Sequence, residues 1–128
     1  MPRSLKVLVV DDDMVALEIA RARLEKMGHE VVTRDSAVGT TAMIIREKPD
    51  VLLLDVEMPL LSGDEIMHAI REKRLVNRGD ELSFILYSGT EVSELRRLVK
   101  ETGALGAIHK AQDSAAFAAT FERLVRHL

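Results

Sequence analysis

The sequence contains no cysteine, and this absence removes several kinds of site at once. The chain cannot form disulfides, bind a metal through thiolates or use a cysteine as a nucleophile. The composition suits a reducing compartment, and we expect the protein to be cytoplasmic. The four histidines, His29, His68, His109 and His127, are scattered without the spacing of a metal site, so we expect structural or surface roles for them.

Long apolar runs and blocks of positive charge are also missing. The longest apolar runs, such as residues 51–54, are far shorter than the roughly 20 residues of a transmembrane helix, and residues 1–6 are too few for a signal peptide. The formal net charge is −3, and the basic residues are dispersed among acidic ones. The sequence therefore predicts no membrane span and no direct contact with nucleic acid.

The chain has 128 residues, 47% of them hydrophobic, which is enough for one domain over residues 1–128 with a substantial core. Short aliphatic runs alternate with longer amphipathic segments. The five predicted strands are residues 6–10, 30–34, 51–55, 84–87 and 106–109. The five predicted helices are residues 14–27, 36–47, 63–73, 91–102 and 113–128. This alternation predicts an α/β fold with a doubly wound parallel sheet, whose ligands bind at the carboxyl ends of the strands.

Several residues at the ends of these segments are typical helix boundaries. Asp13 and Asp113 are predicted N-caps, and Gly28 and Gly103 are predicted to end the helices that precede them. The last helix places Phe117, Phe121, Leu124 and Leu128 along one stripe that we expect to be buried.

Polar residues stand at the predicted strand ends. Asp11 and Asp12 follow the first strand, and Asp55 ends the third. Three carboxylates in one crevice repel one another, at an order of 4 kcal/mol per close pair for an effective dielectric of about 20. A divalent cation removes that penalty, and an all-oxygen set of ligands favours Mg²⁺ over zinc or copper.

The ends of the last two strands carry a hydroxyl and an ammonium group. Ser88 ends the fourth strand and Lys110 follows the fifth. A hydrogen-bond donor and a positive charge are what a transferring phosphoryl group needs around its oxygens. A carboxylate can act as the nucleophile, because aspartyl phosphates are an established type of covalent intermediate.

Four segments, VVDDD, LLLDVEMPLLSG, ILYSG and AIHK, resemble in order and spacing the receiver domains of two-component response regulators, over nearly the whole chain. The resemblance implies a flavodoxin-like fold with five helices and strand order 2-1-3-4-5. It also implies that Asp55 is the phosphoacceptor and that Ser88 and Lys110 assist it. In the Mg²⁺ site that it implies, Asp12 and Asp55 bind through their side chains and Glu57 through its backbone carbonyl, while Asp11 acts mostly through water.

By the same resemblance the protein is a switch and not an enzyme. Its expected partners are a sensor histidine kinase or histidine phosphotransfer protein, and a downstream protein or output domain.

Two residues depart from the family pattern. Ala111 stands where receiver domains usually have a proline with a cis bond, and a cis bond before alanine costs about 3–4 kcal/mol, so we expect a trans bond here. Ala107 replaces the aromatic residue that in many members swings inward on phosphorylation. No large ring at position 107 can therefore report a movement of Ser88 to the surface.

Two alternatives remain open at the level of sequence. DDDMV also fits the D-x-D-x-V motif of haloacid dehalogenase-like phosphohydrolases, in which Asp11 would be the nucleophile. That interpretation leaves DVEMP unexplained, and Asp113 stands alone where an acidic pair is expected. The other alternative is a degenerate receiver that binds partners without phosphorylation, which Ala107 and Ala111 favour.

Overall fold

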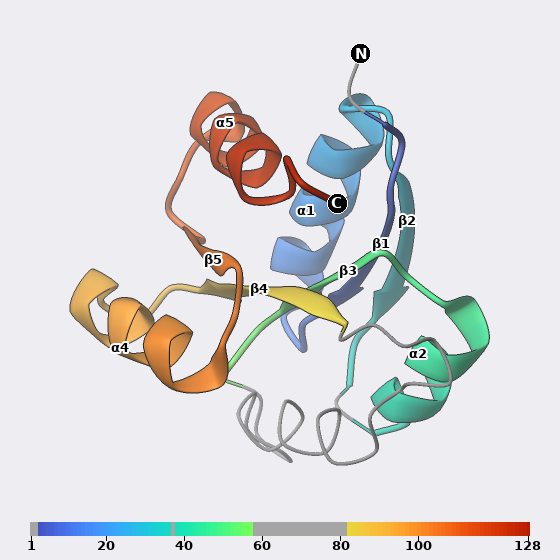
Figure 1. Cartoon of the computed structure of the whole chain (residues 1–128), viewed down its shortest axis with the longest axis horizontal. Coiled ribbons are helices and arrows are strands. Elements are labelled where there is room, and N and C mark those ends of the chain that lie inside the picture. Colours follow the sequence, from blue (N-terminus) through green and yellow to red (C-terminus); the bar gives the residue numbers. More distant parts are fainter. Residues whose placement is uncertain (1–2, 37, 58–81) are drawn as a thin grey trace.

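The computed structural model describes residues 3–36, 38–57 and 82–128 as one parallel sheet with helices on both faces (Figure 1). The strands are β1 (Lys6–Val10), β2 (Glu30–Arg34), β3 (Val51–Leu54), β4 (Ser83–Ser88) and β5 (Gly106–His109). The described helices are α1 (Met14–Lys26), α2 (Thr40–Glu47), α4 (Val92–Thr102) and α5 (Ser114–Leu124). The helix predicted over residues 63–73 lies outside the described residues.

All five strands are parallel, and their order is β2-β1-β3-β4-β5, which confirms the predicted sheet. The VLLL run forms β3, which lies between β1 and β4, and all four of its side chains are fully buried. A central parallel strand is covered on both faces, so its sequence is continuously apolar instead of alternating.

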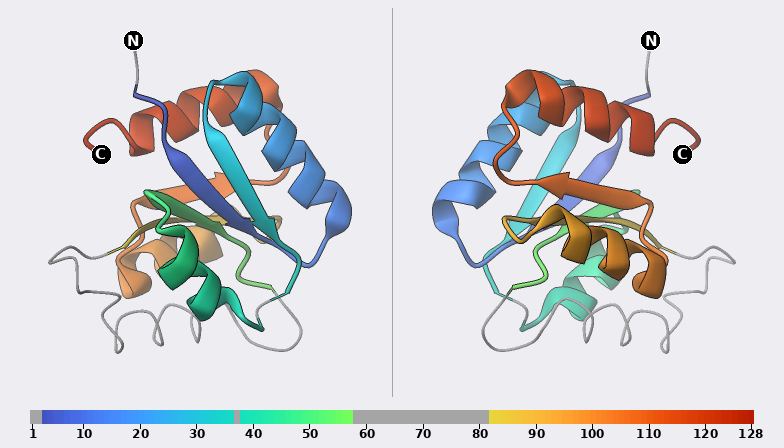
Figure 2. Two further views of the ribbon diagram at one scale, coloured as in Figure 1. Left: turned by 90° about the vertical axis from the view of Figure 1, so that its right-hand side faces the viewer. Right: turned by 90° about the vertical axis from the view of Figure 1, so that its left-hand side faces the viewer.

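The helices cover the two faces of the sheet in pairs, with α1 and α5 on one face and α2 and α4 on the other (Figure 2). Successive side chains of a strand point to opposite faces, so each strand contributes to both layers. Val7, Val9, Leu53, Tyr87 and Ile108 face α1 and α5. Leu8, Val10, Leu52, Leu86 and Ala107 face α2 and α4. No helix in the described part of the chain is long and apolar enough to cross a membrane.

The predicted helix boundaries are confirmed at four positions. The Asp13 carboxylate accepts hydrogen bonds from the backbone N–H groups of Val15 and Ala16, and Asp113 accepts one from Ala116. Gly28 and Gly103 follow α1 and α4 with φ of 95° and 77°. Such positive φ values strain other residues, so glycine suits both positions.

Two predicted boundaries are wrong. The second helix begins at Thr40 and not at residue 36, because Ser36 forms a turn in which its hydroxyl accepts from Val38 N–H and its carbonyl accepts from Thr40. The last helix ends at Leu124, so Leu128 leaves the apolar stripe and is 37% exposed instead of buried.

His29 contacts both the start of β1 and α5, and its buried ring should make the free energy of unfolding depend on pH. Its Nδ1 accepts a hydrogen bond of 3.1 Å from the Leu5 N–H, and its ring lies 5.3 Å from that of Phe121. Burial lowers the pKa of His29, and the charge of Glu122 opposes this only in part. As pH falls below the ordinary value of 6.5, the unfolded chain therefore takes up this proton more readily than the folded protein, and stability is lost.

Urea denaturation between about pH 7 and pH 5 tests this expectation. The parent should lose more stability over this range than His29→Gln, whose amide oxygen can still accept the Leu5 hydrogen bond. The exposed His127→Gln variant is the control and should behave as the parent does. Equal pH dependence in the parent and His29→Gln would show that His29 is not responsible.

Candidate functional site

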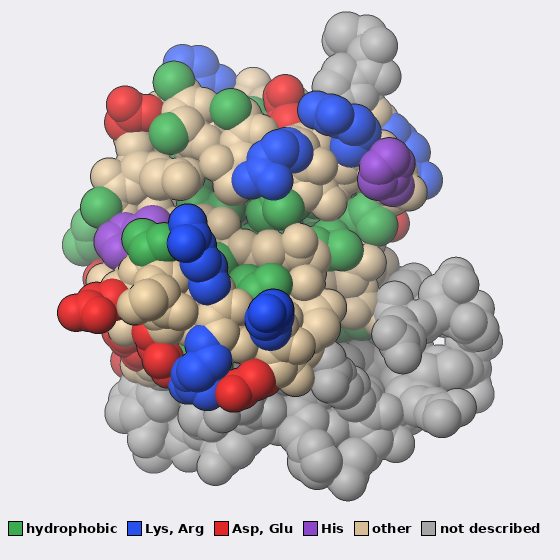
Figure 3. Space-filling view, turned by 60° about the vertical axis from the view of Figure 1, so that its left-hand side comes forward, with side chains coloured by type: hydrophobic (Ala, Val, Ile, Leu, Met, Phe, Trp, Pro, Cys, Tyr) green, Lys and Arg blue, Asp and Glu red, His purple; other side chains and the backbone are tan. Residues whose placement is uncertain are grey.

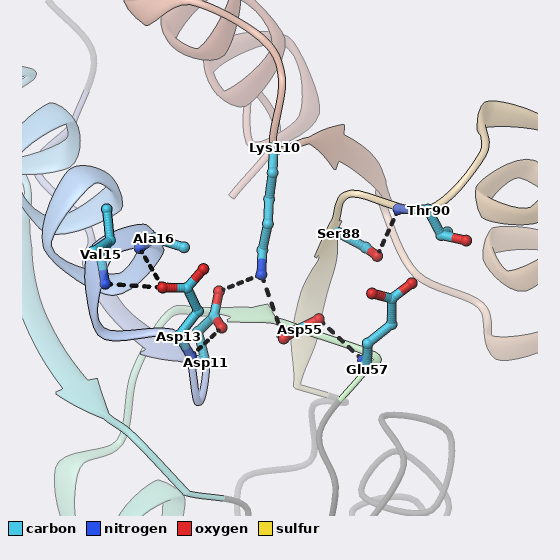
Figure 4. A network of polar contacts seen from close by, with 9 residues as sticks. All are labelled: Asp11, Asp13, Val15, Ala16, Asp55, Glu57, Ser88, Thr90 and Lys110. Atoms are coloured by element: carbon cyan, nitrogen blue, oxygen red, sulfur yellow. Dashed lines mark hydrogen bonds and ion pairs between the residues drawn. The ribbon is translucent and has the colours of Figure 1, made fainter.

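The ends of β1, β3, β4 and β5 bring the predicted site residues together at one edge of the sheet (Figure 4). The sheet's hydrogen bonds extend one residue past three of these strands. The backbone N–H groups of Asp11, Asp55 and Lys110 donate to the backbone carbonyls of Arg34, Val10 and Ser88, at 3.0, 2.9 and 2.9 Å in that order. These backbone hydrogen bonds therefore fix the positions from which the side chains of Asp11, Asp55 and Lys110 extend.

Lys110 extends its side chain between two buried carboxylates. Its Nζ lies 2.9 Å from Asp11 Oδ2 and 3.4 Å from Asp55 Oδ2. Asp11 is fully buried and Asp55 is 2% exposed. Burial lowers the pKa of Lys110, but its close contact with Asp11 and the charges of Asp55 and Asp11 outweigh this effect and hold the pKa above its ordinary value. The lysine is therefore positively charged.

The site disfavours the ionised form of the Asp11 carboxyl group. Burial raises its pKa from 3.8 to about 6, and the negative charge of Asp55 acts in the same direction. The contacts with Lys110 and with the Asp13 N–H lower the pKa and offset only part of the shift. A buried carboxylate that resists ionisation gains from any further positive charge placed beside it.

The three predicted aspartates fit a divalent cation. Asp11, Asp12 and Asp55 each offer one carboxylate oxygen, and these oxygens lie within 4.8 Å of one another. Asp12 is exposed, so the cluster opens to solvent on one side. Asp11 Oδ2 is buried and accepts no hydrogen bond from the described residues, although Lys110 Nζ lies 2.9 Å away as an ion pair. Hard oxygen ligands with an unsatisfied buried oxygen are suited to Mg²⁺.

Ser88 and Glu57 complete the described surroundings of Asp55. The Glu57 N–H donates to Asp55 Oδ1 at 3.0 Å, and the Glu57 side chain is exposed. Ser88 is fully buried at the end of β4, and its Oγ accepts from the Thr90 N–H at 3.1 Å. Because this oxygen accepts that bond, the hydroxyl proton can be donated to an incoming oxygen. Among the described residues, no peptide bond is cis, which confirms the trans bond expected between Lys110 and Ala111.

Sequence reasoning missed two contacts of the lysine loop. Lys110 Nζ lies over the ring of Tyr87, 5.5 Å from its centroid. Arg23 on α1 donates to the backbone carbonyl of Gln112 at 3.0 Å. Alternation along β4 predicts that Tyr87 lies on the opposite face from Ser88, but it does not predict the contact with Lys110. The contact of Arg23 joins residues 89 positions apart in the chain, and no local pattern indicates it.

A hollow of about 720 Å³ lies between α4, β5 and α5, on the face shown in Figure 3. Ala107 lies in the lining of this hollow. Its other apolar lining residues are Val92, Leu95 and Val99, and its basic lining residues are Arg96, Arg97, Lys100 and Arg123. Figure 3 shows basic and hydrophobic side chains interspersed over this face.

The fold and this edge define a class of α/β protein in which carboxylates, a hydroxyl and a lysine meet at the carboxyl ends of parallel strands. The family model described as the response regulator receiver domain matches residues 7–122. The chain belongs to this family, whose members are phosphorylation-dependent signalling switches.

Individual relatives agree with this assignment. Response regulator MprA of Mycobacterium leprae is 34% identical over 91 residues, which are 70% of this chain and 38% of that protein. The alkaline phosphatase synthesis transcriptional regulatory protein PhoP of Bacillus subtilis is 34% identical over 71 residues, or 56% of this chain and 30% of that protein. The chain thus spans less than two fifths of the length of these relatives.

Solved structures of receiver domains share the fold. The chemotaxis response regulator CheY4 of Vibrio cholerae is 24% identical with a TM-score of 0.82, and the match covers 95% of this chain and 99% of that one. The BeF3-activated receiver domain of Klebsiella pneumoniae RstA is 25% identical with a TM-score of 0.81 and the same coverage. The receiver domain of the histidine kinase PA1611 of Pseudomonas aeruginosa is 19% identical with a TM-score of 0.80, covering 97% and 99%, and holds a magnesium ion in its active site cleft.

Replacing Asp11 with asparagine should stabilise the protein at neutral pH when Mg²⁺ is absent. Because the folded state raises the pKa of Asp11 to about 6, the unfolded chain loses this proton at lower pH than the folded protein does. Stability therefore falls as pH rises from about 4 to about 6 and then levels off. We expect Asp11→Asn to raise the free energy of unfolding by about 2–3 kcal/mol at about pH 7.5, and by little near pH 4.

Urea denaturation in the presence of EDTA measures both values. The exposed Asp35→Asn variant is the matched control and should change little at either pH. Added Mg²⁺ should then stabilise the parent more than it stabilises Asp11→Asn. Destabilisation of Asp11→Asn at neutral pH would contradict the electrostatic cost assigned to Asp11.

Proposed function

We propose that this chain acts by accepting a phosphoryl group on Asp55. The observation that carries the proposal is the setting of Asp55, a carboxylate that is 2% exposed, lies 3.4 Å from the Lys110 ammonium and is oriented by the Glu57 N–H. A carboxylate held beside a cation and a hydroxyl is equipped to receive a phosphoryl group. The phosphohydrolase alternative places the nucleophile on Asp11, and membership of the receiver family supports Asp55 instead.

The transfer can be written for the residues present. An Asp55 carboxylate oxygen attacks the phosphorus of a phosphohistidine, the P–N bond breaks, and the imidazole nitrogen leaves with the bonding electrons and takes up a proton. Lys110 stabilises the negative charge of the phosphoryl oxygens, and the Ser88 hydroxyl donates to one of them. The product is an aspartyl phosphate, and no further turnover is required, so we regard the chain as a switch and not as an enzyme.

The acidic cluster supports Mg²⁺ as the cofactor. Asp12 and Asp55 would hold it through carboxylate oxygens and Glu57 through its backbone carbonyl, with Asp11 contributing through water. Bound Mg²⁺ supplies positive charge that neutralises the phosphoryl oxygens during transfer. The magnesium ion in the PA1611 receiver domain supports this assignment by analogy.

The remaining parts of the proposal concern switching and partners. We propose that a sensor histidine kinase or a histidine phosphotransfer protein is the donor and that a downstream protein or output domain is the target. We also propose a fifth helix over residues 63–73, as in other receiver domains, and a cytoplasmic location. The hollow beside Ala107 gives a target an apolar surface with a basic rim. With alanine at position 107, the signal would depend on changes in the shape or charge of this surface and not on the swing of an aromatic ring.

Incubation with acetyl phosphate and Mg²⁺ tests the site of phosphorylation. Trapping the adduct and mapping it by mass spectrometry should locate the phosphoryl group on Asp55. Asp55→Asn should remove it, and the exposed Asp35→Asn variant should not. Phosphate on Asp11, together with steady turnover of a small phosphomonoester, would favour the phosphohydrolase. No adduct at all would favour a receiver that acts without phosphorylation.

The charge of Glu57 should influence how long the aspartyl phosphate lasts. The Glu57 side chain is exposed and the Glu57 N–H donates to Asp55, so we expect its charge to act on water that approaches a phosphorylated Asp55. We expect the decay rate in Glu57→Ala to differ from that of the parent by about threefold to tenfold, since one nearby charge alters such a barrier by about 1 kcal/mol. Glu57→Gln keeps the size of the side chain and isolates the charge. Equal decay in all three proteins would end this idea.

A further inference from the structure

Tyr87 in β4 and Lys110, one residue past the end of β5, lie on the same face of the sheet. In the pairing of β4 with β5, Tyr87 stands opposite Ile108, and Lys110 is two residues further along. Side chains two residues apart in a strand point to the same face, so the lysine lies diagonally beyond the ring. Its Nζ lies 5.5 Å from the ring centroid, which is within the range of a cation–π interaction.

The ring itself is held in place from behind. Tyr87 is 2% exposed and makes an edge-on contact with Phe117 of α5, with 6.0 Å between centroids. The guanidinium of Arg23 lies 5.4 Å from the Phe117 centroid and also donates to the Gln112 carbonyl in the loop after Lys110. The aromatic surface beneath the lysine is therefore part of the core and not a mobile neighbour.

The backbone after β5 fixes the Cα position of Lys110 but not the conformation of its side chain. Lys110 is followed by Ala111 through a trans bond, and the Ala111 N–H donates to His109 Nδ1 at 3.0 Å. These contacts fix where the side chain starts. A stem of four carbons retains several rotamers from that point, so a second contact is needed to aim its end.

We propose that Tyr87 is the positioning residue of Lys110, its ring holding the ammonium group against Asp11 and Asp55. The ring and the two carboxylates contact the ammonium together, so the lysine is directed before a phosphoryl group arrives. The interaction concerns the aromatic face, so phenylalanine can replace tyrosine and an aliphatic residue cannot. The inference rests on the proposed function where it concerns phosphorylation, and on the structure alone where it concerns the position of the lysine.

A double-mutant cycle between positions 87 and 110 tests the kinetic part. Intact-protein mass spectrometry gives the rate of phosphorylation by acetyl phosphate at saturating Mg²⁺. We expect Tyr87→Leu to slow the reaction about tenfold and Tyr87→Phe to retain most of the parent rate. In a Lys110→Ala background, Tyr87→Leu should alter the rate of phosphorylation less than about twofold. Phe121→Leu is the control for core loss, because Phe121 lies behind Phe117 in the same layer, and it should leave the rate nearly unchanged.

An equal loss of rate from Tyr87→Leu with and without Lys110 would overturn the proposal, because a purely structural role acts in both backgrounds. So would a loss of the parent rate in Tyr87→Phe.

The position of the lysine can be measured without any phosphoryl transfer. In the parent, the ε-methylene protons of Lys110 should show an upfield ring-current shift in NMR spectra, which Tyr87→Phe keeps and Tyr87→Leu loses. Absence of this shift in the parent overturns the inference even if Tyr87→Leu does not fold. A parent that shows the shift but takes no phosphate contradicts the proposed function and leaves the positioning role standing.

Discussion

Lys110 holds its ammonium group between Asp11 and Asp55, two carboxylates that the ends of β1 and β3 bury side by side. Without this cation the two negative charges would lie in the interior with no compensation, a situation that costs several kcal/mol in proteins. The sheet order makes the contact possible, because it places β3 next to β1 and brings β5 to the same edge through β4. The high pKa of Lys110 and the raised pKa of Asp11 are two consequences of the same arrangement.

One lysine does not balance this edge. Asp11, Asp12 and Asp55 contribute three carboxylates, and Lys110 contributes one positive charge, so the described cluster is short of positive charge. This deficit supports the proposal that the site takes a divalent cation and then a phosphoryl group. The raised pKa of Asp11 supports the proposed ligand site, because a carboxyl group that resists ionisation gains from added positive charge.

The sequence allowed much of the fold to be predicted because its local signals agree with one another. The VLLL run indicated a central strand, and Asp13 was correctly taken as the cap of α1. The strand ends also placed Asp11, Asp55, Ser88 and Lys110 at one edge, since parallel strands share a direction. Position in the chain thus predicts which residues meet, even though Asp55 and Lys110 are 55 residues apart.

The wrong or missing predictions concern contacts that the hydrophobic periodicity of the sequence does not describe. The start of α2 depends on a turn at Ser36, where side-chain and backbone bonds compete with the helix. The end of α5 moved inward, so the stripe that includes Leu128 was too long. Tyr87 was assigned only to a strand, because alternation gives its face but not its charged neighbour Lys110, which lies one residue past the end of β5. Side-chain pairs of this kind depend on register, and register requires the assembled sheet.

A crystal structure with Mg²⁺ and beryllium fluoride would show whether Asp55 is the phosphoacceptor, because beryllofluoride stands in for the phosphoryl group without transfer or decay. We expect beryllofluoride bonded to a carboxylate oxygen of Asp55, with Lys110 Nζ and Ser88 Oγ within hydrogen-bond distance of its fluorides and Mg²⁺ between Asp12 and Asp55. Beryllofluoride on Asp11, or an Asp55 that remains paired with Lys110 and carries no adduct at saturating fluoride, would contradict this expectation.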